Sequence, residues 1–242
     1  MTDEPYRWLE AVANRREYIR DQLKGATPVF AFSRPEGVLL CGVGTGQSKV
    51  FEVYDRQGLA ALGHPVDIEK VRQTLIEAAH LEGFTRAPED VNVRRLLSFS
   101  LSPALKTSFE QIFAAPLIVE SILAEVGATQ AEDNLARISY DGSFRLETRG
   151  VLVAHTVSED ETAATDWLRR ELRPEHSLAQ VAHLALAAWG SLTNGKPFAP
   201  PAAATTADGP IAVADRVVEL ALLQRRSPRR AAYLPVDPAS LS

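Results

Sequence analysis

The order in which strand-like and helix-like segments follow one another is the feature that most restricts the fold of this chain. Short apolar runs come first, two amphipathic helical segments follow, and the same alternation repeats before two final strand-like runs. Two antiparallel sheets that pack face to face leave their outer faces uncovered, and pairs of helices can cover those faces. The order therefore predicts an α+β fold, a four-layer αββα sandwich.

The first part of the chain is predicted to form a helix and a hairpin. After a polar lead at 1–5, an amphipathic helix is expected over 6–24, and Gly25 should end it. Its apolar stripe must be buried against its own domain or against a neighbour, and the residues do not decide between the two. Strands at 28–32 and 37–43 follow, apolar enough to be covered on both faces.

A second hairpin is predicted directly after Lys49. Its strands are expected at 50–54 and 59–62, with the turn at 55–58. The glycine-rich segment 44–48 lies just before Lys49, but it lacks the Walker spacing and no helix follows it, so a nucleotide site is not expected.

The remaining elements follow from periodicity and turn signals. A helix is expected over 68–81 with Gly83 ending it, and another over 91–113, kinked at Pro103, with Phe99 and Phe113 on its core face. Four strands should form a meander, with Asp141-Gly142 as a two-residue turn; they are expected at 117–126, 135–140, 144–147 and 150–154.

The last part of the chain carries two helices, a loop and two strands. A capping box of Ser158 and Glu161 should open a helix with Ala163 on its inner face, and a second helix should begin at Ser177. The Pro/Ala-rich segment at about 190–210 is expected to be a mobile loop. Strands at 217–223 and 231–234 should flank a basic turn at 225–230, which suits a solvated hairpin tip better than an anion site.

Composition restricts the function classes. The 242 residues include 31 acidic and 26 basic side chains, a net charge of −5, which leaves no basic surplus for nucleic acid. The single cysteine, Cys41, lies in an apolar run and suits a small buried side chain in a reducing compartment. No apolar run reaches the roughly 18 residues of a membrane span, so we expect a cytoplasmic protein without membrane contact.

Motifs for metal or cofactor chemistry are not found. The five histidines are scattered, and no pair has helical i, i+4 spacing with a third ligand nearby. Neither a G-x-S-x-G elbow nor a paired cysteine motif occurs. We therefore expect no metal site and no cofactor.

Four segments in order resemble bacterial, actinobacterial-type proteasome α-subunits. In chain order they are Ala26-Thr27, K-V-F-E-V-Y-D-R-Q-G from Lys49, I-S-Y-D-G-S at 138–143 and R-S-P-R-R-A at 226–231. The chain departs from the family at Pro103, in the Pro/Ala-rich loop and in a C-terminus that stops soon after Pro238.

The resemblance implies a fold, a division of the chain and a set of partners. It implies the Ntn-hydrolase fold of proteasome subunits, with a gate segment and ring helix at 1–24 and one αββα domain at 25–242. The implied role is a heptameric ring of α-subunits that caps a threonine-protease β-ring. In such a ring, residues 1 to about 5 gate the entry of unfolded protein substrates. The ring also docks the C-terminal tail of an ATPase activator.

The resemblance also locates the positions that a catalytic subunit of this fold would use. The nucleophile position falls at Ala26, or at Thr27 if the register slips by one, and no Gly-Thr junction is present for processing. Val43 stands at the aspartate position, and Lys49 alone matches. A non-catalytic chain is expected, and the alternative is a self-processed Ntn hydrolase that uses Thr27.

A different role for Lys49 follows from the same resemblance. The matching lysine of α-subunits anchors the carboxylate of an activator tail in a pocket between neighbouring subunits, and Gly25 and Gly63 match glycines that let the tail backbone approach. The alternative is that Lys49 only caps the edge of its hairpin in solvent.

Overall fold

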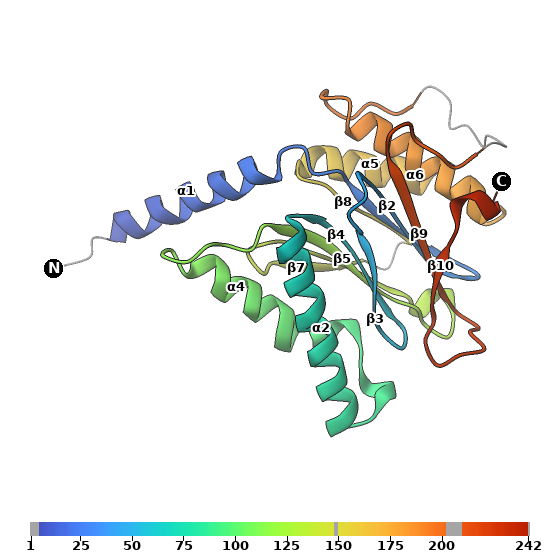
Figure 1. Cartoon of the computed structure of the whole chain (residues 1–242), viewed down its shortest axis with the longest axis horizontal. Coiled ribbons are helices and arrows are strands. Elements are labelled where there is room, and N and C mark those ends of the chain that lie inside the picture. Colours follow the sequence, from blue (N-terminus) through green and yellow to red (C-terminus); the bar gives the residue numbers. More distant parts are fainter. Residues whose placement is uncertain (1–4, 148–149, 202–209, 242) are drawn as a thin grey trace.

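The computed structural model describes residues 5–147, 150–201 and 210–241, and its body consists of two five-stranded antiparallel sheets (Figure 1). Sheet A contains, in spatial order, β10 (Tyr233–Val236), β9 (Val217–Gln224), β2 (Gly37–Gly44), β1 (Val29–Arg34) and β8 (Val151–Ala154). Sheet B contains β3 (Val50–Tyr54), β4 (Gln57–Gly63), β5 (Val119–Glu125), β6 (Asn134–Ile138) and β7 (Phe144–Glu147).

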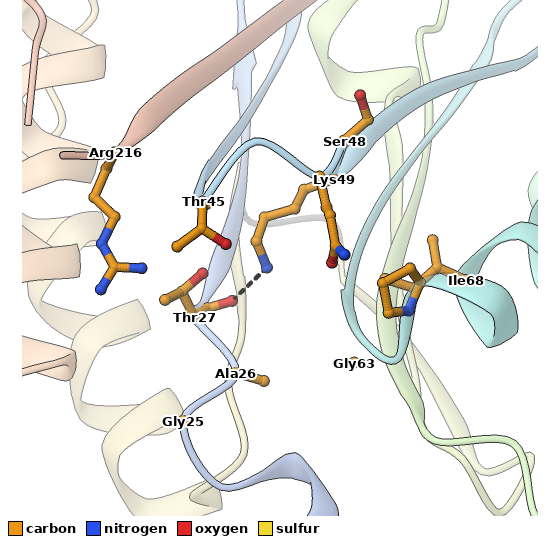
Figure 2. Close-up of a pocket in the computed structure, with 12 residues that line it drawn as sticks. Gly25, Ala26, Thr27, Thr45, Ser48, Lys49, Gly63, Ile68 and Arg216 are labelled. Carbon is orange, nitrogen blue, oxygen red and sulfur yellow. Dashed lines mark hydrogen bonds between the residues drawn. The ribbon is translucent and has the colours of Figure 1, made fainter.

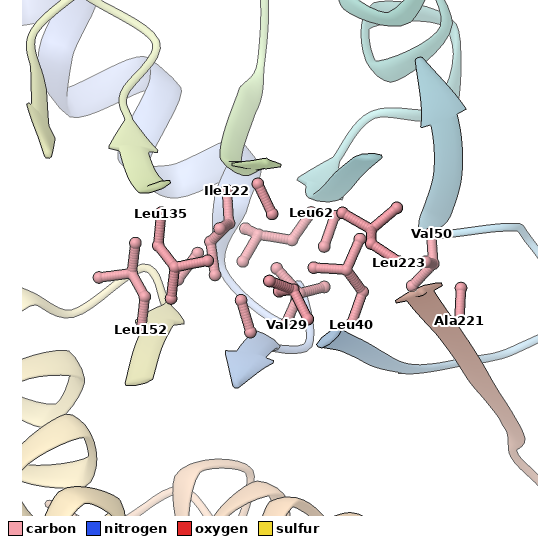
Figure 3. Close-up of a cluster of buried hydrophobic side chains, with 14 of the residues drawn as sticks. Val29, Leu40, Val50, Leu62, Ile122, Leu135, Leu152, Ala221 and Leu223 are labelled. Atoms are coloured by element: carbon pink, nitrogen blue, oxygen red, sulfur yellow. The ribbon is translucent and has the colours of Figure 1, made fainter. Parts of the chain in front are cut away.

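Helices cover the outer face of each sheet, and three apolar cores hold the layers together. Sheet A is covered by α5 (Ser158–Glu171) and α6 (Leu178–Leu192), whose side chains form one core with it. Sheet B is covered by α2 (Pro65–Thr85), α3 (Val93–Leu96) and α4 (Ser102–Glu110), which form a second core. The third core lies between the sheets, where Val29, Leu40 and Leu152 of sheet A meet side chains of sheet B (Figure 3). The expected αββα sandwich is confirmed.

The leading helix α1 (Pro5–Leu23) is only partly attached to this body. Ile19 and Leu23 are buried in the core between the sheets, which settles where the end of the helix packs. In the middle of the helix Arg15 is buried and donates to the Ser108 and Ala114 carbonyls at 2.8 and 2.9 Å. The first turns project away from the sandwich (Figure 1), and the helix exposes Trp8, Leu9 and Tyr18. The helix ends where predicted, before Gly25.

One predicted turn and one predicted helix end are wrong, and in both cases side-chain packing explains the difference. The turn between β3 and β4 contains only Asp55 and Arg56, because Gln57 is buried in β4 and donates to the Val91 carbonyl at 2.9 Å. Gly83 does not end α2, which continues to Thr85. A Cβ there would lie 2.5 Å from the Tyr54 hydroxyl, so this glycine makes room for a packed ring.

The expected disturbance near Pro103 is present as a π-helical turn, Leu97–Leu101, between α3 and α4. This turn changes which side chains face inward. Phe99 is 72% exposed with the Arg95 guanidinium over its ring, and Phe113, beyond the end of α4, is fully exposed. Both were predicted in the core, and both predictions are wrong because a single helical period does not run through the whole segment.

The predicted meander is wrong at its fourth strand. Strand β8 leaves sheet B and pairs with β1 of sheet A, with Val29 opposite Ala154. The connection of β6 to β7 is also longer than the predicted two-residue turn, since the Ser139 N–H donates to the Ser143 carbonyl at 2.9 Å. Within this loop, the Ser143 N–H and hydroxyl both donate to the Asp141 carboxylate.

The predicted capping box at α5 does not form. No side chain caps this helix, because the Glu161 carboxylate binds Arg137 and Arg145 instead, and Ala163 faces solvent. The start of the next helix is confirmed, with a capping box between Ser177 and Gln180.

The segment predicted as a mobile loop has an ordered beginning. Helix α6 continues to Leu192, and Phe198 then packs on Trp167 with ring centroids 6.2 Å apart and donates its N–H to Asp160 at 2.8 Å. Residues 202–209 of that segment lie outside the described residues.

Two smaller predictions concern Cys41 and the basic turn. Cys41 is fully buried, as predicted, and burial raises the pKa of its thiol to about 12. The turn after β9 is only partly solvated, because Arg225 turns inward and binds both oxygens of Asp133 at 2.7 and 2.9 Å.

Candidate functional site

A pocket of about 220 Å³ lies where α1, the two hairpins and the start of α2 meet (Figure 2). Lys49, Gly25 and Gly63, which the sequence predicted to act together, all line it. The other lining residues are Ala26, Thr27, Gly44, Thr45, Gln47, Ser48, Pro65, Ile68 and Arg216. The pocket therefore forms where segments distant in the sequence converge, and its walls consist mainly of small and uncharged residues.

Lys49 reaches into this pocket from the start of β3. Its ammonium donates to the Thr27 carbonyl at 3.3 Å, and its stem lies against Gly44, where a Cβ would stand 3.1 Å from Lys49 Cε. Burial lowers the pKa of Lys49 to about 8, and the negative charge of Glu219 opposes that shift. Lys49 therefore does not extend into solvent from the edge of its hairpin.

Glu219 of β9 fixes the backbone on which Lys49 stands. One of its carboxylate oxygens accepts the Lys49 N–H at 2.9 Å and the Val50 N–H at 3.2 Å. The carboxylate is thus engaged by two backbone donors, and the Lys49 ammonium has the Thr27 carbonyl as its hydrogen-bond acceptor. An ammonium can donate three hydrogen bonds, so capacity remains for a ligand oxygen.

Gly25 and Gly63 are both required by the backbone. Gly25 has φ of 83° with open space around the missing Cβ, whereas Gly63 has φ of 131° and a Cβ there would lie 2.1 Å from the Ile118 carbonyl oxygen. These are conformations that side chains with a Cβ rarely adopt. Glycine at both positions is explained by the fold, and the open surface that results at Gly25 is available to a ligand.

The parts of a threonine-nucleophile centre do not come together around Thr27. Its hydroxyl donates to the Val43 carbonyl, its carbonyl accepts from Lys49, and its amide joins Ala26 and the preceding helix. Val43 itself is buried and apolar, so it supplies no carboxylate. The arrangement offers a cation in a recess, which suits the binding of a carboxylate.

Sequence reasoning missed Arg216 and Glu219. Arg216 lies directly before β9 and Glu219 lies within it. Strand β9 pairs with β2, with Val218 opposite Val43, although the two strands are far apart in the sequence. No local pattern near Lys49 indicates them, and only the pairing of β2 with β9 would have found them.

A second pocket of about 350 Å³ lies on the other side of the 25–27 segment. It shares Arg216 and the 25–27 segment with the first pocket. Its other lining residues are His155, Thr156, Trp189, Leu192, Thr193 and Gly195. Arg216 therefore borders both recesses.

Among the described residues, no group of three or more His, Cys, Asp or Glu side chains is placed to hold a metal ion. The described helices also include none that is long and apolar enough to span a bilayer.

Comparison with known proteins gives a consistent set of relatives. The proteasome subunit alpha of Actinosynnema mirum is 32% identical over 225 residues, which cover 92% of this chain and 80% of that protein. The proteasome subunit alpha of Mycolicibacterium vanbaalenii is 31% identical, with 92% and 82% covered, and that of Pseudarthrobacter chlorophenolicus is 30% identical, with 90% and 86% covered. No protein-family model matches the sequence.

Proposed function

Because the chain belongs to the family of proteasome α-subunits, we propose that it is a non-catalytic subunit of an α-ring that caps the β-ring of a threonine-type protease. The ring consists of seven copies that contact one another and the β-subunits. Residues 1–24 form the gate segment and ring helix, and residues 25–242 form the domain that carries them. Unfolded protein substrates pass through the ring in the cytoplasm on their way to the β-subunits.

The observation that carries the second part of the proposal is the position of Lys49. Its ammonium is held in a recess beside the open backbone of Gly25, with one carbonyl as its hydrogen-bond acceptor. A C-terminal carboxylate supplies the oxygen atoms that such a cation lacks, and a chain end can enter a recess that a folded surface cannot. The pocket therefore docks the C-terminal tail of an ATPase activator.

Replacement of Lys49 tests the docking. Lys49→Ala should abolish activator-stimulated degradation of an unfolded protein while the native mass of the particle stays unchanged. The loss of one charge-assisted hydrogen bond costs roughly 1.5–3 kcal/mol per site, and several sites in one ring multiply the effect. Lys49→Arg should restore only part, since a planar fork replaces a compact ammonium.

Lys196→Ala is the matched control, because this lysine is exposed and lies outside the pocket. Unchanged stimulation in Lys49→Ala would contradict the docking role, whereas dissociation of the ring would make Lys49 a structural residue.

The gate is tested by trimming residues 1 to about 5. The trimmed ring should degrade an unfolded protein faster without an activator and should change small-peptide turnover less, because a small peptide passes a narrow opening more easily. Equal rates for trimmed and full-length rings on the unfolded protein would contradict a gate.

The alternative of a self-processed Ntn hydrolase is tested by intact mass. Processing at Thr27 would remove residues 1–26 and free an amine beside the Lys49 ammonium. We expect the full mass and no peptidase activity from the purified chain. Labelling of Thr27 by a threonine-directed covalent inhibitor would support the alternative.

A further inference from the structure

The pocket around Lys49 contains a second cation that the docking of one carboxylate leaves unused. Figure 2 shows Arg216 on the opposite side of Thr27 from the Lys49 ammonium. In the part of the chain that the structure describes, the Arg216 guanidinium has no hydrogen bond and no ion pair. Other exposed arginines, such as Arg94 and Arg226, also lack a side-chain partner among the described residues, so what distinguishes Arg216 is its position in the lining of this pocket and of the second pocket.

The backbone fixes Arg216 at the rim of the pocket. Its N–H donates to the Val213 carbonyl at 3.2 Å and closes a turn in which Asp215 has φ of 56°. A non-glycine residue in this region is uncommon, and such residues are concentrated at functional sites. The turn leads directly into β9, the strand whose Glu219 also holds the backbone of Lys49. One strand therefore positions both cations.

The charges of the pocket are unbalanced. Its described lining includes two cations and no carboxylate, although the chain as a whole has a net charge of −5. Glu219 lies outside that lining, and its carboxylate is occupied by the Lys49 and Val50 amides. A tail that brings only its terminal carboxylate would neutralise one cation and leave the other without a partner.

We propose that the tail docked here carries two negative charges, its terminal carboxylate at Lys49 and an acidic side chain in one of its last two residues at Arg216. This inference rests on the proposed docking function. A guanidinium presents a planar fork that a carboxylate can meet with two parallel hydrogen bonds, so Arg216 selects for Asp or Glu over an uncharged side chain. The second pocket, which Arg216 also borders, gives that side chain room beside the 25–27 segment.

Short fluorescent peptides test the inference on rings of the full-length chain assembled with the β-subunit. Two probes end in Glu-Leu and Leu-Glu with a free carboxylate, two matched probes carry Gln in place of Glu, and the last pair repeats the acidic sequences with a C-terminal amide. Because Arg216 is exposed, we expect the Glu probe of the preferred register to bind roughly two- to fivefold tighter than its Gln counterpart. The preference should shrink at high ionic strength.

Three variants assign the preference to Arg216. Arg216→Ala should remove the difference between Glu and Gln while the free acid still binds better than the amide, and Arg216→Lys should retain part of the difference. Arg226→Ala, an exposed arginine of the distal hairpin tip, should change neither preference.

Equal binding of Glu and Gln probes to the unmodified ring, or a Glu preference that survives in Arg216→Ala, would overturn the inference. The proposed docking function stands in that case if the free acid still binds better than the amide and Lys49→Ala removes this advantage. Equal binding of acid and amide would overturn both.

Discussion

Lys49 and Arg137 are two cations withdrawn from water in the same chain, and their surroundings are opposite. Arg137 of β6 is 7% exposed and is enclosed by acceptors, with Glu120 at 2.5 Å, Glu161 at 3.0 Å and the Ile138 carbonyl at 2.7 Å. Lys49 has one carbonyl acceptor at 3.3 Å and faces a pocket.

The pKa of each group records the difference. Burial alone would lower the pKa of Arg137, but Glu120 and Glu161 raise it overall. Burial also lowers the pKa of Lys49, and there the negative charge of Glu219 does not compensate. A closed charge network holds layers together, whereas an incompletely satisfied cation is available for a ligand.

The largest expected effect comes from opening the closed network. Arg137→Met should lower the free energy of unfolding by about 3–5 kcal/mol, because it removes, within the described part of the chain, the only arginine bound to the buried Glu120 and one of the two bound to the buried Glu161. Chemical denaturation of the purified chain measures this. Arg145→Met is the matched control, since Arg145 binds the same Glu161 from a side chain that is 54% exposed, and its loss should cost about 1 kcal/mol or less.

Equal losses of stability in Arg137→Met and Arg145→Met would contradict a special role for the buried network. A second experiment adds Glu120→Gln and Glu161→Gln to Arg137→Met. These changes remove the negative charges that Arg137 no longer neutralises, so they should restore part of the lost stability.

A smaller effect on the free energy of unfolding is expected from Lys49, and it depends on pH. Its pKa is about 8 in the folded chain and 10.5 in the unfolded chain, so the cost of burying the charge is fully present below pH 8. Between these values the unfolded chain binds more protons than the folded chain, and stability therefore rises with pH.

Lys49→Met removes this dependence. The unmodified chain should gain roughly 1–3 kcal/mol relative to Lys49→Met between pH 8 and pH 10.5, measured by denaturation across that range. Parallel stability curves for the two proteins would show that the ammonium is solvated rather than buried.

The smallest expected effect is on docking, and it runs against the stability change. The free pocket loses its Lys49 cation as pH rises through about 8, so activator-stimulated degradation should weaken by up to roughly tenfold per pH unit above that value. Small-peptide turnover by the β-ring at each pH is the control. Stimulation that stays constant to pH 9.5 would argue against a docked carboxylate at Lys49.

These features differ in how far the sequence could predict them. Lys49 and Gly63 lie at the two ends of one hairpin, so the periodicity that predicts the hairpin also places them near each other. Arg216 and Glu219 reach the same pocket through the pairing of β2 with β9, which no local pattern reports. The four-layer order was predictable because each layer needs its own run of apolar residues.

The errors have a common physical cause, which is competition from tertiary contacts. Glu161 has the spacing of a capping residue, but Arg137 and Arg145 bind its carboxylate instead. Phe99 has helical spacing, but the π-helical turn before Pro103 rotates it to the surface. Strand β8 follows β7 closely, but its four buried residues fill the gap beside β1.

The strand order of the two sheets has a consequence for how this polypeptide is made. In sheet B each strand from β4 to β7 pairs with the strand that precedes it in the chain, so β3 to β7 can pair in the order in which a ribosome releases them. In sheet A the central strand β2 needs β9, with Leu39 opposite Leu222, and until then its apolar edge is open. Exposed strand edges of this kind invite pairing with other chains. The newborn chain is therefore most vulnerable to aggregation late in its synthesis, and a premature stop before Val217 would leave that edge permanently unprotected.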